Sequence, residues 1–84
     1  MTDLEITERI KKIVTPYVQR QEGLENFNKQ TDFLNDLKIN SANLVDVILD
    51  VEDEFDIEID NDSMEGMLTV GDAKRIIQAK LEEK

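Results

Sequence analysis

The sequence contains neither cysteine nor histidine among its 84 residues, and these two absences exclude much of enzyme chemistry. Without cysteine there is no disulfide and no thiol nucleophile, and without both residues there is no Cys/His zinc site. Without histidine, no imidazole can act as general base for a serine or threonine nucleophile. Any catalysis would therefore depend on carboxylates, serine, lysine or tyrosine.

Long apolar segments are also missing, and we expect no N-terminal signal peptide. No run of 18 apolar residues occurs, and the first five residues lack the basic start and apolar stretch of a signal peptide. We therefore expect a soluble, cytoplasmic monomer that forms a single domain over residues 1–84. A domain of this size buries only about 60% of the surface of its unfolded chain, so a binding or carrier module is favoured over an enzyme.

Basic residues are absent from the middle of the chain. The 35 residues between Lys38 and Lys74 contain 11 acids and no base, so this segment carries all of the net charge of −10. Such a concentration indicates either a face that binds basic protein surfaces or cations, or a solvated surface that keeps the protein soluble. It would repel phosphates, so nucleic acid is not an expected partner.

The first half of the chain shows one helical pattern followed by a gap. Apolar residues recur at helical spacing over residues 3–18, where Asp3 is the predicted N-cap and Pro16 predicts a kink or an early stop. Residues 19–40 lose the pattern and predict a loop of unusual length. Isolated apolar residues anchor this loop: Leu24, Phe27, Phe33, Leu34 and Leu37.

The strongest helical pattern begins at Asn40 or Ser41 and ends near Phe55. One side is predicted to be buried and consists of Leu44, Val45, Ile48, Val51 and Phe55. Glu52 points toward this side, so it should lie at the edge of the stripe or be paired by a base. Val47 and Leu49 flank the stripe. Leu49 is either exposed beside the acidic row or packed against a neighbouring helix.

Two further helical segments follow. Residues 60–66 permit one or two turns ending at Gly66, and Thr69 is predicted to cap a last helix with Asp72 at its third position. The buried stripe of this last helix would be Val70, Ala73, Ile76, Ile77 and Leu81. The predicted fold is therefore all-α, with three longer helices and one short helix around an aliphatic core.

The alternating acids after residue 50 invite a calcium-site interpretation, which the sequence does not support. An EF-hand loop that starts at Asp56 would have Asn61 in place of glycine and Met67 in place of the final glutamate. A loop that starts at Asp50 fails at the same two positions. We therefore expect no specific metal site.

Ser41 lies at the predicted start of the acidic helix. Free backbone N–H groups and the helix dipole favour a negatively charged group there, so the position suits a phosphate ester. Alternatively, Ser41 only caps or opens the helix.

The surrounding sequence resembles the acyl carrier protein family. Asp36-Leu37, three residues, and then Ser41 match the modification site of that family. The helix then closes in Glu52-Asp53-Glu54-Phe55-Asp56-Ile57-Glu58-Ile59, which matches the end of the family's second helix almost residue by residue. The resemblance continues through Leu68-Thr69-Val70 and covers most of the chain, except for an extended first loop near residues 19–30.

The sequence departs from the family at the attachment site. Asn40-Ser41-Ala42 stands where the family has Asp-Ser-Leu, and Lys38 stands where a glycine is common. Asn40 removes a charge next to the incoming phosphate, and Ala42 removes an apolar contact. These departures leave open which transferase modifies Ser41.

The resemblance implies a carrier and not an enzyme. A phosphopantetheinyl transferase would attach 4′-phosphopantetheine covalently to Ser41, and acyl groups would be carried on its thiol in fatty-acid, specialised lipid or polyketide-type biosynthesis. Acyl-loading and acyl-processing enzymes would dock through basic patches on Asp46, Leu49, Asp50, Asp53 and Glu54. The acyl chain would be sheltered by Val45, Ile48, Ile59, Met64 and Ile77. A D-alanyl or aminoacyl carrier and an unmodified acidic interaction domain are the alternatives.

Overall fold

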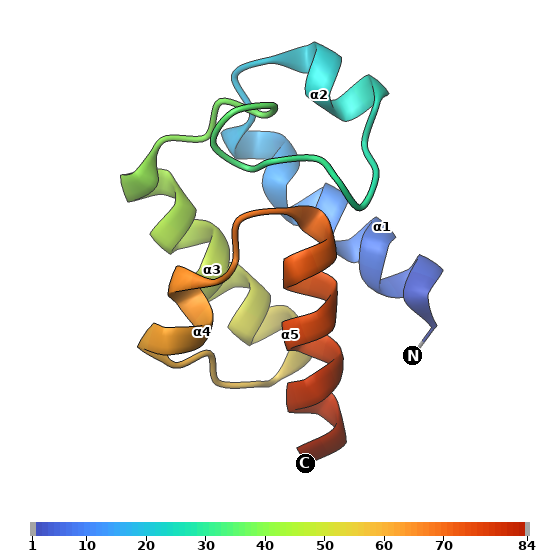
Figure 1. Cartoon of the computed structure of the whole chain (residues 1–84), viewed down its shortest axis with the longest axis vertical. Coiled ribbons are helices and arrows are strands. Elements are labelled where there is room, and N and C mark those ends of the chain that lie inside the picture. Colours follow the sequence, from blue (N-terminus) through green and yellow to red (C-terminus); the bar gives the residue numbers. More distant parts are fainter. Residues whose placement is uncertain (1, 84) are drawn as a thin grey trace.

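Three longer helices enclose the core in the computed structural model, which describes residues 2–83 (Figure 1). These residues contain no β-strand, which confirms the all-α prediction, and two short helices are present where one was expected. In chain order the elements are α1 (Asp3–Val14), the 3₁₀ turn η1 (Thr15–Tyr17), α2 (Gln21–Glu25), α3 (Ser41–Phe55), α4 (Asn61–Glu65) and α5 (Val70–Glu83).

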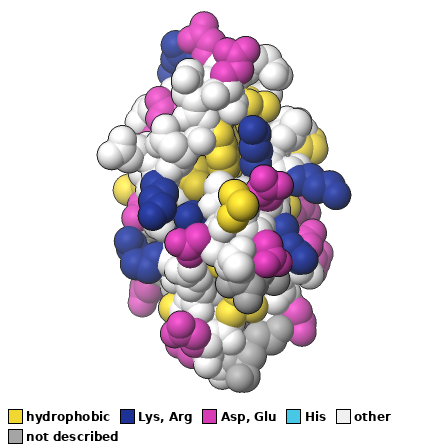
Figure 2. All heavy atoms as spheres, turned by 90° about the vertical axis from the view of Figure 1, so that its right-hand side faces the viewer, with side chains coloured by type: hydrophobic (Ala, Val, Ile, Leu, Met, Phe, Trp, Pro, Cys, Tyr) yellow, Lys and Arg dark blue, Asp and Glu magenta, His cyan; other side chains and the backbone are white. Residues whose placement is uncertain are grey.

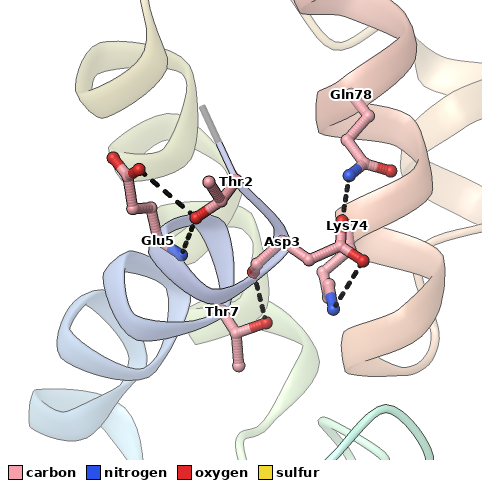
Figure 3. A network of polar contacts seen from close by, with 6 residues as sticks. All are labelled: Thr2, Asp3, Glu5, Thr7, Lys74 and Gln78. Carbon is pink, nitrogen blue, oxygen red and sulfur yellow. Dashed lines mark hydrogen bonds and ion pairs between the residues drawn. The ribbon is translucent and has the colours of Figure 1, made fainter.

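The N-cap of α1 is Thr2, so the prediction of Asp3 was wrong by one residue. The Glu5 N–H donates to the Thr2 hydroxyl oxygen at 3.1 Å. Asp3 is instead the first helical residue, and its carboxylate reaches across to α5 (Figure 3). There it accepts a hydrogen bond from Gln78 and lies 3.9 Å from the ammonium group of Lys74, whose side chain is almost buried. Asp3 thereby ties the start of α1 to the middle of α5.

Pro16 ends α1 as predicted. The helix stops at Val14, and the chain continues as the 3₁₀ turn η1 with Pro16 in its first turn. A proline in that place has no N–H to donate to the preceding helical turn, so the α-helical ladder cannot continue.

The segment 19–40 is more ordered than the predicted loop. It contains α2, and an isolated β-bridge joins Asp32 to Thr69 just before α5. Gly23 of α2 is required by space, because a Cβ there would lie 2.5 Å from the Asp36 carbonyl oxygen. The expected anchors differ in burial: Phe33 and Leu37 are buried, Leu24 and Phe27 pack against the core, and Leu34 is exposed.

The buried side of α3 is rotated relative to the prediction. Val47 is buried, whereas Val45, expected in the stripe, is 44% exposed. Tyr17 of η1 and Arg9 of α1 bond to Asp50 and Glu54 of α3, so α1 lies against the side of α3 that also carries Val47. Packing against α1 therefore decides which of the two valines is buried. The remaining stripe residues are confirmed, with Leu44 partly buried.

Glu52 finds a backbone partner and not a base. Its half-buried carboxylate accepts the Ile59 N–H at 2.7 Å, which satisfies the charge at the edge of the stripe. This bond also fixes the loop that follows α3. The helix ends at Phe55, and its C-cap is Asp56, whose φ of 54° places it in the left-handed region.

The remaining helix boundaries agree with the sequence. Asp60 caps α4 by accepting the Ser63 N–H at 2.7 Å, and α4 ends at Glu65 with Gly66 as its C-cap. That backbone hydrogen bond is the main reason why the pKa of Asp60 lies below its usual value. On α5, Val70, Ala73 and Ile77 are buried, and Ile76 and Leu81 pack partly against the core.

A reciprocal capping box starts α5. The Thr69 N–H donates to the Asp72 carboxylate and the Asp72 N–H donates to the Thr69 hydroxyl oxygen, both at 3.2 Å. Burial raises the pKa of Asp72, but hydrogen bonds from Thr69, Arg75 and Leu68 outweigh it, so this pKa lies below its usual value.

Candidate functional site

Ser41 is the first residue of α3, and its side chain is exposed. The helix is capped by Asn40, whose side-chain oxygen accepts the Asn43 N–H at 2.8 Å. Within residues 2–83 the Ser41 hydroxyl makes no hydrogen bond, so capping is not its role. The structure thus leaves a free hydroxyl at the positive end of a 15-residue helix dipole.

The chain enters α3 through a strained turn. Lys38 has a φ of 57°, in the left-handed region that glycine adopts more readily than other residues. A glycine would adopt this conformation without strain. The next residue, Ile39, is buried, and its N–H donates to the Phe33 carbonyl at 3.1 Å. The turn therefore anchors the backbone two residues before Ser41.

One exposed side of α3 extends from Ser41 along the helix. We call it the outer face of α3, and it consists of Ala42, Val45, Asp46, Leu49 and Asp53. Leu49 is 52% exposed, which decides between its two alternatives in favour of an exposed apolar residue. Asp46 and Asp53 make no hydrogen bond or ion pair within the described residues. The outer face thus combines apolar side chains with unpaired carboxylates.

Two of the predicted docking acids face α1. Asp50 accepts a hydrogen bond from the Tyr17 hydroxyl at 2.8 Å, and Glu54 pairs with Arg9 at 2.9 Å. The bond to Asp50 is the main reason why the pKa of Tyr17 is raised, with burial and the charges of Asp50 and Asp46 adding to it. The five predicted partner-binding residues therefore divide into two groups on α3. Asp46, Leu49 and Asp53 lie on the outer face, and Asp50 and Glu54 lie on the side of α1.

The residues expected to shelter the acyl chain lie only partly in one cluster. Ile48, Ile59 and Ile77 belong to one buried cluster, and Met64 packs against it. Val45 lies on the outer face and does not join them. Nothing in the sequence indicated that Leu68 is an exposed apolar residue. It is 51% exposed and lies in the loop between α4 and α5. No local pattern signals such exposure, because residues 67–69 form neither a helix nor a strand.

The end of α3 forms an acidic groove that contains one base. It has a volume of about 850 Å³, and Lys80 lies in it 3.6 Å from the carboxylate of Asp60. No group of three or more carboxylates in the part of the chain that the structure describes is arranged to hold a metal ion. The groove is therefore acidic without forming a chelating site.

The surface formed by α1 and α5 carries charges of both signs. Figure 2 shows basic and acidic side chains interspersed on that side of the molecule. Pairs account for part of this mixing, since Arg75 lies 3.0 Å from Asp72 and Lys74 lies near Asp3. Among residues 2–83, no helix combines the length and the apolar character needed to cross a membrane.

The fold and the site define a small helical carrier domain. A free serine hydroxyl stands at the head of an acidic helix, and the sequence has no histidine or cysteine to serve as its base. The hydroxyl is exposed, and the outer face of α3 lies beside it.

Comparisons with known proteins identify the family. Residues 12–77 match the family model described as "Phosphopantetheine attachment site". The chain is 36% identical over 77 residues to the acyl carrier protein of Phenylobacterium zucineum, covering 92% of this chain and 95% of that protein. It is 37% identical over 79 residues to the acyl carrier protein of Lactobacillus acidophilus, covering 94% and 96%.

A solved structure agrees with these relatives. The acyl carrier protein from Enterococcus faecalis superposes with a TM-score of 0.77 and 28% identity, covering 95% of this chain and 99% of that one. The chain therefore belongs to the phosphopantetheine attachment family of acyl carrier proteins. It acts as an acyl carrier and not as a catalyst, and its covalent cofactor is phosphopantetheine. Family membership implies interaction with a phosphopantetheinyl transferase and with acyl-handling enzymes.

Proposed function

We propose that Ser41 is the residue that carries 4′-phosphopantetheine. The observation that supports this most directly is the exposed Ser41 hydroxyl, which has no hydrogen bond within residues 2–83 and does not cap its helix. In the transfer, the Ser41 oxygen forms a bond to the phosphorus that joins pantetheine to the rest of coenzyme A, and its proton passes to a base of the transferase. The bond from that phosphorus to the adenosine bisphosphate half breaks, and this half leaves. The new phosphodiester then lies at the positive end of the α3 dipole, which favours its negative charge.

Ser41→Ala is expected to abolish the modification. The protein is incubated with coenzyme A and a broad-specificity phosphopantetheinyl transferase, and its intact mass is measured. The control is Ser63→Ala, which alters the only other serine. The wild type and this control should each gain the mass of one phosphopantetheine group. No gain in the wild type, or a gain that persists in Ser41→Ala, would contradict the proposal.

Asn40 and Ala42 fit this role in different ways. Asn40 keeps the cap that positions Ser41, because its side-chain oxygen holds the Asn43 N–H. It does so without the charge that an aspartate would place beside the phosphate. Ala42 is exposed and offers a partner little apolar surface. Contacts with partner enzymes should therefore depend on residues farther along α3.

Partner enzymes are proposed to meet α3 with basic patches. Asp46 and Asp53 are unpaired in the structure described, and Leu49 between them supplies apolar area. Exposed charge pairs form fast, weak and salt-sensitive complexes, which suits a carrier that must leave each partner. Binding to a cognate enzyme should weaken as salt rises from low to physiological concentration. An unchanged affinity would contradict this electrostatic docking.

The cargo and the cellular setting remain predictions from the sequence. Loading assays with an acyl-activating and an aminoacyl-adenylating enzyme separate the acyl role in lipid or polyketide synthesis from the D-alanyl alternative. A monomer and a cytoplasmic location are also expected, and the first is tested by light scattering.

A further inference from the structure

We propose that a small pocket between α1 and α5 binds an oxyanion of the phosphate class. The pocket has a volume of about 120 Å³. Its lining residues come from three segments that are far apart in the sequence, and they are Asp3, Lys29, Gly71, Lys74, Arg75 and Gln78. Three of them are bases and one is an acid, in a protein whose net charge is −10. None of these six residues belongs to α3, so the proposal does not depend on the modification of Ser41.

Lys74 is the main reason to expect a ligand in this pocket. Its side chain is only 8% exposed, yet its ammonium group makes no hydrogen bond within residues 2–83. The group still reaches the pocket, because no fully buried side-chain nitrogen in the described part of the chain lacks a hydrogen bond. Removing a charged donor from water without giving it an acceptor is costly. An oxygen that entered the pocket would offset this cost.

The Asp3 carboxylate does not supply that oxygen, because Gln78 holds it (Figure 3). The Gln78 amide donates to one carboxylate oxygen, and the Lys74 ammonium lies 3.9 Å from the other, which is too far for a hydrogen bond. The Asp3 side chain is also 60% exposed, so solvent screens much of its charge. Asp3 therefore neutralises Lys74 only in part.

Lys29 and Arg75 supply two further cations. Lys29 has no ion pair within residues 2–83, and Arg75 bonds to Asp72 through one nitrogen at 3.0 Å, which leaves other guanidinium donors available. Gly71 allows the loop to approach α5 closely. Its N–H donates to the Lys29 carbonyl at 2.8 Å, and a Cβ on residue 71 would lie 2.9 Å from that oxygen. The backbone thus holds a loop lysine beside the two bases of the helix.

The arrangement of the cations favours a tetrahedral anion. Lys29 comes from the loop after α2, whereas Lys74 and Arg75 come from α5, so the donors belong to different elements. A phosphate presents oxygens in several directions, whereas a carboxylate presents two in one plane. A volume of about 120 Å³ equals about four water molecules of about 30 Å³ each, which suits one phosphate group. The first three N–H groups of α5 already donate to oxygens of the chain, so side chains must bind the anion.

Titration with inorganic phosphate tests the site. Chloride is replaced by phosphate at constant ionic strength and neutral pH, and the amide signals of the ¹⁵N-labelled protein are followed. We expect saturable shifts at Lys29, Gly71 and Gln78 with a millimolar Kd, and none of comparable size along α3. Lys74→Gln should raise the Kd about tenfold, because it removes a hydrogen bond to a charged group.

Three further variants separate the pocket from general charge effects. Lys12→Gln is the matched control, since it removes one charge from an exposed position on α1 outside the pocket, and it should leave the Kd unchanged. Lys29→Gln repeats the test on an exposed side chain, where the change does not disturb the core, and should raise the Kd about threefold. Asp3→Asn should lower the Kd about threefold, because it removes the competing carboxylate.

Phenyl phosphate distinguishes the two sources of the anion. Equal affinity for phenyl phosphate and inorganic phosphate would support a site for the phosphate group of a larger molecule, and binding of inorganic phosphate alone would support a site for the free anion. Shifts that grow linearly without saturation would overturn the proposal. So would a Kd that Lys74→Gln and Lys29→Gln leave unchanged, or one that Lys12→Gln raises as much as they do.

Discussion

The outer face of α3 and the surface formed by α1 and α5 use aspartate in opposite ways. On α1 and α5, Asp3 and Asp72 are tied to Lys74, Thr69 and Arg75. On the outer face, Asp46 and Asp53 have no partner within the described residues. The same side chain thus stabilises the fold where partners surround it and remains available for recognition where they are absent.

The difference follows from where the bases lie in the sequence. All ten lysines and arginines fall outside residues 39–73, so the acids of α3 can be neutralised only by bases from the segments before or after residues 39–73, or by another protein. Arg9 reaches Glu54, and Lys80 reaches Asp60, but neither pairs with the outer face. The outer face of α3, beside Ser41, therefore stays acidic.

The largest expected effect separates the two sides of α3. Ile48 is 1% exposed and Leu49 is 52% exposed, although they are neighbours. Ile48→Ala should lower the free energy of unfolding by about 2–5 kcal/mol, because it leaves a cavity in the core. Leu49→Ala should change it by less than about 0.5 kcal/mol. Urea denaturation followed by circular dichroism measures both, and similar losses would mean that Leu49 is part of the packed fold.

A smaller effect distinguishes a structural acid from a recognition acid. Asp72→Ala should cost about 1 kcal/mol, because the capping box of α5 is lost. Asp46→Ala, the matched control on the outer face, should cost nothing or stabilise slightly, since it removes an unpaired charge from an acidic surface.

The pH dependence of the Asp72 effect has a defined sign. The pKa of Asp72 is lower in the folded state than its usual value, so ionised Asp72 stabilises the fold above the aspartate pKa of about 3.9. This contribution is lost as the pH falls through the lower folded value. Denaturation from neutral to acid pH should therefore show the difference between wild type and Asp72→Ala shrinking below about pH 4. A constant difference would assign the loss to the side chain's shape and not to its charge.

The smallest expected effect concerns the turn that leads into α3. Lys38→Gly should stabilise the protein by up to about 1 kcal/mol, because relief of the left-handed strain exceeds the added entropy of the unfolded chain. Lys38→Ala is the control, since it removes the charge and keeps the strain. Thermal unfolding compares the two variants, and a glycine variant no more stable than the alanine variant would argue against strain at this turn.

Much of the fold could be predicted from local signals. Helix boundaries depend on residues that act on their immediate neighbours. The boundaries implied by Pro16, by Gly66 and by the pair Thr69 and Asp72 agree with the structure. The segment 19–40 was less predictable. Its short helix α2 depends on Gly23 packing against the Asp36 carbonyl, and its bridge depends on Thr69, which is far away in the sequence.

The candidate site divides in the same way. The position of Ser41 at a helix start follows from periodicity, which fixes the spacing of apolar and polar residues along α3. The exposure of Leu49 was left open by the sequence, and the structure decided it. Periodicity does not fix how far a helix rotates about its axis. That rotation is set by α1, which buries Val47 and leaves Val45 exposed.

The sequence by itself determined an all-α carrier with its charge concentrated in residues 39–73 and a serine at the head of the acidic helix. The tertiary structure alone decided which acids are engaged and which are free. Asp50 and Glu54 meet Tyr17 and Arg9, whereas Asp46 and Asp53 do not meet a base within residues 2–83. The reason is physical: composition and spacing are properties of one segment, but a contact between α1 and α3 exists only once both helices pack on the same core.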